Sequence, residues 1–292
     1  MTNVGRLAAR FALVLALAIG SAVGSIACAE KGAEKDKVEP AAKQETGARE
    51  VQPAPMGKAD AASAAVVTQL TDAMGGQKTW DDLPYFRFDF VAVRDGKEIA
   101  RFRHWWDKRL GRCRVEGPDD KGRNVAAIFN LSDKKGRSFT DGIVDSDSAN
   151  IAAIINMGYE RWVNDTYWVI MPFKLRDPGA ILKHERTERT EDGIEYDILG
   201  LSFEQGTGLT PSDHYWIYVN RGTHLIDKWE YVLTGQKPPP QSASWEGWTS
   251  VGPLKLSLAR RFQGKPVMLR FENVATPATM EETVFTYSRV RY

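Results

Sequence analysis

The 292-residue sequence contains 39 Lys and Arg against 38 Asp and Glu, a formal net charge of +1, and nine Trp, nine Tyr and twelve Phe. Arg6 and Arg10 lie in a leader that we expect to be removed, which leaves 37 basic and 38 acidic residues. A surface that binds nucleic acid needs a basic excess, so nucleic acid is not expected as a partner.

Residues 1–29 have the layout of a bacterial export signal. Arg6 and Arg10 form a positive region, residues 11–19 are an uncharged apolar run, and small residues follow. A membrane-spanning helix needs about 20 solidly apolar residues, whereas this run is shorter and is broken by Gly and Ser. We therefore predict an exported protein.

Two cleavage sites compete at the end of this signal. Residues 27–29 (Ala-Cys-Ala) fit ordinary signal peptidase, whereas residues 25–28 (Ser-Ile-Ala-Cys) resemble a lipobox, with Ser25 where Leu is usual, and predict lipidation of Cys28. Residues 30–61 are rich in Ala, Lys, Glu and Pro, a composition that favours a disordered tether. The expected location is therefore an outer-membrane lipoprotein facing the periplasm through its lipid anchor or, with plain cleavage, the soluble periplasm.

Residues 62–292 are predicted to form one β-rich domain that begins with a short helix. Helical spacing relates Ala65, Val66, Gln69, Leu70 and Ala73, and Gly75-Gly76 is typical of a helix end. From residue 85 the period changes to two. Phe86, Phe88 and Phe90 alternate with charged residues, Asp95-Gly96 predicts a two-residue turn, and residues 99–106 return as the second strand.

Nine further strands are predicted after this hairpin, making eleven. They cover residues 111–116, 123–130, 180–188, 194–203, 214–220, 224–233, 244–251, 254–262 and 266–274. Their short links contain Gly, Asp, Asn or Pro, which favours neighbouring antiparallel strands. The fold class is therefore mainly β: one large, curved antiparallel sheet or half-open barrel.

Residues 146–174 interrupt the strand pattern. Good helix N-cap residues are Ser146, Asp147 and Ser148, and Ile151, Ile154, Ile155 and Trp162 follow at helical spacing. Residues 167–173 are an apolar stretch with no polar face. We predict a central helical lid over the concave face of the sheet.

Motifs for enzymatic chemistry are absent from the sequence. It contains no nucleophile elbow, phosphate-binding loop, dinucleotide fingerprint or zinc-protease motif, so neither catalysis, nor a cofactor, nor a metal site is predicted. His104, His184, His214 and His224 are interpreted as surface or interfacial residues. Asp165 and Asp213 lie beside aromatic segments, although helix-end and turn capping is the favoured interpretation of both. Cys113 is predicted to point inward as a small apolar group.

The order of elements resembles the LolA/LolB-like superfamily of bacterial envelope carriers. The resemblance covers residues 62–275: a helix ending in Gly75-Gly76, Trp80 and Leu83, a meander, a helical insertion, residues 252–256 (Gly-Pro-Leu-Lys-Leu) and a strand ending at residues 270–274. It implies a half-barrel of about eleven strands with a helical lid over an apolar cavity, in proteins that carry lipoproteins or lipids. Residues 162–168 are similar to uncharacterised members.

The expected function is binding of an apolar ligand, such as the acyl chains of a lipid or an acylated protein, by a monomer. Aromatic and apolar residues of the inner face and the lid are the predicted ligand-binding residues: Phe86, Phe88, Phe90, Phe102, Trp106, Trp162, Tyr167, Trp168, Met171, Phe173, Trp229 and Tyr231. The alternative is a non-catalytic interaction module, in which the protein's own side chains fill the cavity and its surface binds another envelope protein.

Overall fold

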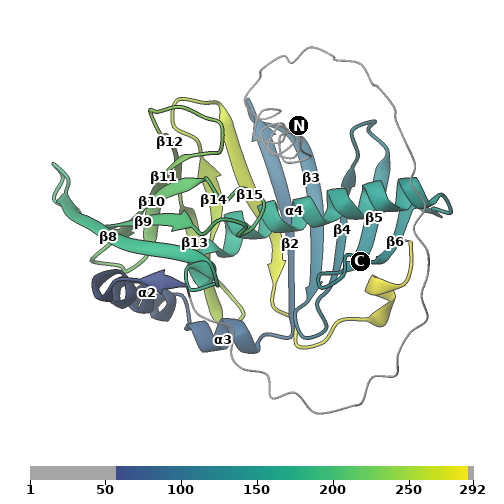
Figure 1. The fold of residues 1–292 in the computed structure, drawn as a ribbon, viewed down its shortest axis with the longest axis horizontal. Coiled ribbons are helices and arrows are strands. Elements are labelled where there is room, and N and C mark those ends of the chain that lie inside the picture. The colour runs from purple at the N-terminus through teal and green to yellow at the C-terminus, as the bar shows by residue number, and fades with distance from the viewer. Residues whose placement is uncertain (1–56, 289–292) are drawn as a thin grey trace.

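The computed structural model describes residues 57–288, which form two mainly antiparallel sheets around a long helix (Figure 1). The six-stranded sheet has the order β1 (Lys58–Ala59), β8 (Ala180–Arg189), β9 (Glu195–Phe203), β10 (His214–Asn220), β11 (Ile226–Val232) and β12 (Gln241–Ser244). The nine-stranded sheet has the order β13 (Glu246–Val251), β14 (Leu254–Arg261), β15 (Val267–Ala275), β2 (Tyr85–Arg94), β3 (Lys97–Asp107), β4 (Arg112–Pro118), β5 (Asn124–Asn130), β6 (Gly136–Thr140) and β7 (Ile143–Val144). The helices are α2 (Ala61–Ala73), α3 (Gln77–Asp82), α4 (Ser148–Lys174) and the 3-10 helix η1 (Glu282–Phe285).

The two sheets meet at Trp245, the single residue between β12 and β13. Its backbone N–H still donates to Asp227 O of β11 at 2.7 Å, and an isolated bridge joins Ala243 to Phe262 across the junction. The chain therefore passes from one sheet to the other without a loop. The prediction of a mainly antiparallel β fold is confirmed, but the surface is divided into two sheets and is not closed into a barrel.

All eleven predicted strands are present, and four short ones were missed: β1, β6, β7 and β12. These strands have two to five residues, too few to establish a period of two. The predicted strand 244–251 is also divided, because Ser244 ends β12 in one sheet and Glu246 begins β13 in the other.

The β2–β3 hairpin forms as predicted and directs its aromatic rings inward. Asp95 and Gly96 have φ values of 50° and 75°, as a two-residue turn between twisted strands requires. Phe86, Phe88 and Phe90 are buried. They belong to one core cluster that also contains Cys113, which is fully buried as predicted and whose thiol pKa is raised by burial.

The described structure begins slightly before the predicted domain boundary at residue 62. β1 pairs with β8 in parallel, and Asp60 caps α2 by accepting a hydrogen bond from Ser63 N at 2.7 Å. The last residues of the predicted tether therefore belong to the folded domain. The predicted signal, Cys28 and the tether up to residue 56 lie outside the described residues.

Helix α4 runs across the sheets (Figure 1) and forms the centre of the core, where a lid was predicted. It is continuous over 27 residues, because residues 167–173 prolong the amphipathic turns instead of forming a separate segment. Val169, Ile170, Met171 and Phe173 are at most 2% exposed. A helix that is apolar on every side is buried on every side, so this half of α4 packs into the core.

A proline and a buried arginine together fix the C-terminal half of α4 to the nine-stranded sheet. Pro172 lies inside the helix and has no N–H, which leaves the carbonyl of Trp168, four residues earlier, without its helical partner. Arg260 of β14 supplies the missing donor, with Nη2 2.6 Å from Trp168 O. The guanidinium also lies over the Trp245 ring, at the junction of the sheets.

A buried charge network anchors the middle of α4. Asp165 accepts hydrogen bonds from His104 Nε2 at 2.8 Å, from Arg161 Nη2 at 2.5 Å and from Asn164 Nδ2 at 2.8 Å. Burial opposes ionisation of Asp165, but Arg161 and His104 hold the pKa of its carboxyl below the ordinary value. Burial lowers the pKa of His104, against the opposing effect of Asp165.

This network corrects two predictions. A surface or interfacial position was predicted for His104, but this residue is buried, because β3 places it under α4. Asp165 lies within the helix and neutralises a buried arginine, so it does not cap a helix end. The other three histidines are half-buried. Of the three N-cap candidates, Asp147 caps α4, accepting a hydrogen bond from Asn150 N at 2.7 Å.

Candidate functional site

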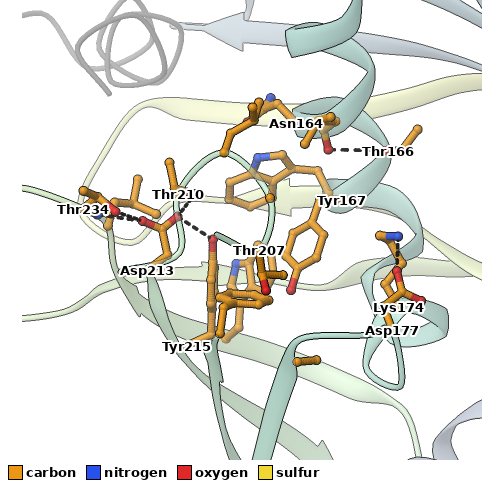
Figure 2. Close-up of a pocket in the computed structure, with 18 of the residues that line it drawn as sticks. Asn164, Thr166, Tyr167, Lys174, Asp177, Thr207, Thr210, Asp213, Tyr215 and Thr234 are labelled. Carbon is orange, nitrogen blue, oxygen red and sulfur yellow. Dashed lines mark hydrogen bonds and ion pairs between the residues drawn. The ribbon is translucent and has the colours of Figure 1, made fainter. Parts of the chain in front are cut away.

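A cavity of about 320 Å³ opens beside the C-terminal half of α4, on the side of the six-stranded sheet (Figure 2). Its walls come from α4, from the turn between α4 and β8, from the loop between β9 and β10, and from β10 and β11 with the residues that follow β11. Segments that are far apart in the sequence therefore enclose one site.

Aromatic rings form much of the wall. Tyr167 and Trp168 come from α4, and Tyr215 and Trp229 come from β10 and β11. The ring centroids of Trp168 and Trp229 are 4.7 Å apart in an edge-to-face arrangement, and those of Tyr215 and Trp229 are 5.1 Å apart. Burial raises the pKa of both tyrosines, with a further contribution from Asp213 to each, so their hydroxyls stay neutral.

Asp213 holds one end of the cavity together. Its carboxylate accepts hydrogen bonds from Thr210 Oγ1 at 2.7 Å and from Tyr215 Oη at 3.2 Å, and from the backbone N–H and hydroxyl of Thr234 at 2.7 and 2.8 Å. These contacts join the β9–β10 loop to the end of β11 (Figure 2). Asp213 thus acts as a turn and loop clamp, as the capping interpretation predicted, and it also faces the cavity.

An ion pair lies on the other side of the aromatic rings. Lys174 Nζ contacts Asp177 Oδ2, and Figure 2 shows this pair opposite Asp213, with Tyr167 and Tyr215 between them. Both residues of the pair are partly exposed, whereas Asp213 is buried. The cavity therefore has a neutralised charge pair on one side and a carboxylate with uncharged partners on the other.

The structure brings four of the twelve predicted ligand residues to this cavity: Trp162, Tyr167, Trp168 and Trp229. Of the other eight, seven are buried in the core and Trp106 packs against it from a half-buried position, and several of their rings contact another side chain. The guanidinium of Arg161 lies 3.9 Å from the centroid of Phe102, and Phe173 stacks on Trp80 at 5.2 Å. The eight are Phe86, Phe88, Phe90, Phe102, Trp106, Met171, Phe173 and Tyr231.

Sequence reasoning missed the loop side of the cavity. Thr207, Leu209 and Thr210 lie between β9 and β10, and Leu233 and Thr234 follow β11. Thr207, Leu209, Thr210 and Thr234 have the sequence pattern of ordinary loops, and Leu233 ends the predicted strand 224–233. Only Asp213, beside an aromatic strand, had been singled out.

Two buried indole N–H groups of the cavity-lining residues, those of Trp162 and Trp229, lack a hydrogen-bond partner among residues 57–288. Trp229 is 1% exposed, and its indole N–H is unpaired there. Buried donors are normally satisfied by protein, water or a ligand. The described residues contain no group of His, Cys, Asp and Glu arranged to hold a metal, and none of their helices has the length and apolar character to span a membrane.

Comparisons with known proteins identify similar structures only. No protein-family model matches the chain, and no curated protein matches its sequence. A DUF1329 family protein from Desulfovibrio piger is 13% identical, with 77% of this chain and 98% of that chain covered and a TM-score of 0.46. A LolA superfamily protein from Nitrosomonas europaea is 11% identical, with 77% and 97% covered and a TM-score of 0.44.

A third similar structure is a putative outer membrane lipoprotein-sorting protein domain from Vibrio parahaemolyticus. It is 8% identical, with 77% of this chain and 96% of that chain covered and a TM-score of 0.42. Of these three structures, the one from Nitrosomonas europaea bears the name of the superfamily that the sequence resembles. With TM-scores below 0.5, the function has to be inferred from the geometry of this chain itself.

Proposed function

We propose that the protein binds an apolar ligand, such as the acyl chain of a lipid or of an acylated protein, in the cavity beside α4. The observation that carries this proposal is the cavity of about 320 Å³ walled by Tyr167, Trp168, Tyr215 and Trp229. Burying each methylene group contributes about 0.8 kcal/mol, so binding of a chain requires no catalytic group. The unpaired N–H of Trp229 adds a buried donor that an occupant or a water molecule can satisfy.

The alternative function, an interaction module, is favoured by a separate observation. Most of the inner face of the nine-stranded sheet is filled by the protein's own rings, including Phe86, Phe88 and Phe90. Only the region beside the six-stranded sheet would then remain for a ligand. Native mass spectrometry of delipidated protein, with and without added lipid, separates the two functions, because an interaction module would show no adduct.

Filling the cavity should abolish binding. Leu209 is a half-buried loop residue in the wall, so Leu209→Trp should place a large ring in the cavity with little disturbance of the sheets. We expect the affinity for the neutral apolar fluorophore N-phenyl-1-naphthylamine to fall at least tenfold. Leu110→Trp is the matched control, because Leu110 is 61% exposed in the turn between β3 and β4. Equal binding by the two variants would contradict this site.

The same proposal places the domain in the cell envelope. Arg6, Arg10 and the apolar run after them support export, and residues 25–28 support lipidation of Cys28. A lipid anchor followed by a tether would keep the cavity close to a membrane that contains its ligand. The domain itself would remain a soluble, monomeric binding module.

Replacing Cys28 with serine tests the anchor. Because the thioether to the lipid cannot form on serine, we expect Cys28→Ser to move the protein from the membrane fraction to the soluble periplasmic fraction. Cys113→Ser is the matched control and should leave the fractionation unchanged, since this buried thiol lies in the core. Soluble fractionation of the unsubstituted protein would show that the signal is cleaved without lipidation.

A further inference from the structure

The charged groups around the cavity are unequally distributed. Lys174, Asp177 and Asp213 are the charged residues of the lining, which gives it a formal charge of −1. Lys174 and Asp177 neutralise each other at a partly exposed position. The remaining charge belongs to Asp213, which is only 5% exposed.

The hydrogen bonds of Asp213 determine what its end of the cavity can offer to a polar group. All of its donors are uncharged, namely the hydroxyls of Thr210, Tyr215 and Thr234 and one backbone N–H. Each hydroxyl gives its proton to the carboxylate and keeps only acceptor capacity for a ligand. This end of the cavity therefore offers oxygen acceptors and a negative charge.

Such an end discriminates between head groups. A second carboxylate beside Asp213 would meet a like charge in a site where water screens it poorly. An ammonium or hydroxyl group could instead donate to the free lone pairs of the threonine and tyrosine hydroxyls. An ammonium would also be attracted by the charge of Asp213. Aromatic walls do not oppose this preference, because ring faces attract cations.

The size of the cavity limits the number of chains. Ligand cavities have volumes of about 300–1,000 Å³, and the observed volume of about 320 Å³ lies at the lower end of that range. A cavity of this size suits one chain better than the several chains of a triacylated anchor.

We propose that the cavity selects a single-chain amphiphile whose head group is an amine or a hydroxyl and rejects the corresponding carboxylate. This inference rests on the proposed function, since it specifies the ligand class of the same cavity. Asp213 is the specificity-determining residue, and the aromatic wall holds the chain.

Three probes with the same dodecyl chain test this selectivity: dodecylamine, dodecanol and dodecanoate. Binding is measured by displacement of N-phenyl-1-naphthylamine from the full-length protein at neutral pH, below the critical micelle concentration of each probe. We expect dodecylamine and dodecanol to displace the fluorophore and dodecanoate to bind at least tenfold more weakly. The full chain has 39 basic and 38 acidic residues, so its overall charge does not itself produce such a difference in affinity.

Two substitutions locate the cause of the ratio. Asp213→Asn keeps the shape of the clamp and removes its charge. The ratio of the affinity for dodecanoate to the affinity for dodecanol should therefore approach one. Asp177→Asn removes the same formal charge from a position with 46% side-chain exposure and should change the ratio less. Dodecanoate binding as tightly as dodecanol to the unsubstituted protein, or an unchanged ratio in Asp213→Asn, would overturn the selectivity but leave the proposed function intact. Failure of all three probes to bind would overturn both.

Discussion

Replacing Trp168 with alanine is expected to lower the free energy of unfolding by about 3–5 kcal/mol, as truncation of a large buried ring does. The Trp168 ring lies in edge contact with Trp229 at 4.7 Å and with Tyr231 at 6.0 Å, and it is 7% exposed. Its backbone carbonyl, which Arg260 binds, is unchanged by the substitution. The lost free energy of unfolding therefore comes from the Trp168 ring and not from the hydrogen bond between Arg260 and the Trp168 carbonyl. Urea unfolding measures this loss.

The matched control is Trp216→Ala, which removes an indole from a half-buried position on β10. This substitution should cost clearly less than Trp168→Ala, because less apolar surface is withdrawn from water in the folded state. A loss below 1 kcal/mol for Trp168→Ala would mean that this part of α4 moves as a lid after all. A large loss without any ligand bound to the unsubstituted protein would favour the interaction module.

Removing the carboxylate of Asp165 should destabilise the fold by a similar amount, about 3–5 kcal/mol, because it leaves a buried charge without its partner. Asp165 is completely buried, and Arg161, whose side chain is 5% exposed, depends on it for neutralisation. His104 would lose the acceptor of its Nε2 proton at the same time. Thermal and urea unfolding of Asp165→Ala measure this effect.

Two further variants test whether the loss of stability comes from burial of the charge or from the loss of any i,i+4 ion pair in a helix. Asp82→Ala removes the partner of Lys78 in an exposed i,i+4 pair and should change stability by at most about 1 kcal/mol. The double variant Arg161→Met with Asp165→Leu should recover much of the loss, because no unpaired charge then remains beside α4. Equal losses for Asp165→Ala and Asp82→Ala would contradict a buried role for the network.

Local patterns were sufficient for much of the fold. The alternation of Phe86, Phe88 and Phe90 with charged residues predicted both the hairpin and its inner face, since successive side chains in a strand point to opposite sides. Asp147 and the helical spacing after it predicted where α4 begins. Strands of two to five residues escaped because they are too short to show a period.

The candidate site was predictable only in part. Trp162, Tyr167, Trp168 and Trp229 were selected as large rings with apolar neighbours, and the structure places all four in the cavity wall. The same criterion also selected Phe102, whose ring contacts Arg161. Composition cannot distinguish a ring that faces a cavity from one that faces another side chain, because both need an apolar environment.

By itself, the sequence determined the class of the fold, the inner face of its strands and the position of its central helix, because these depend on residues within a few positions of each other. Only the tertiary structure decided which distant residues meet. His104 and Asp165 are 61 positions apart, and Arg260 and Trp168 are 92 apart. Asp213 likewise meets Thr234 and faces the cavity only because β10 and β11 pair side by side. Helix α4 packs in the core because its polar contacts and its apolar surface find partners across the sheets, and a periodic pattern within the helix cannot show which partners these are.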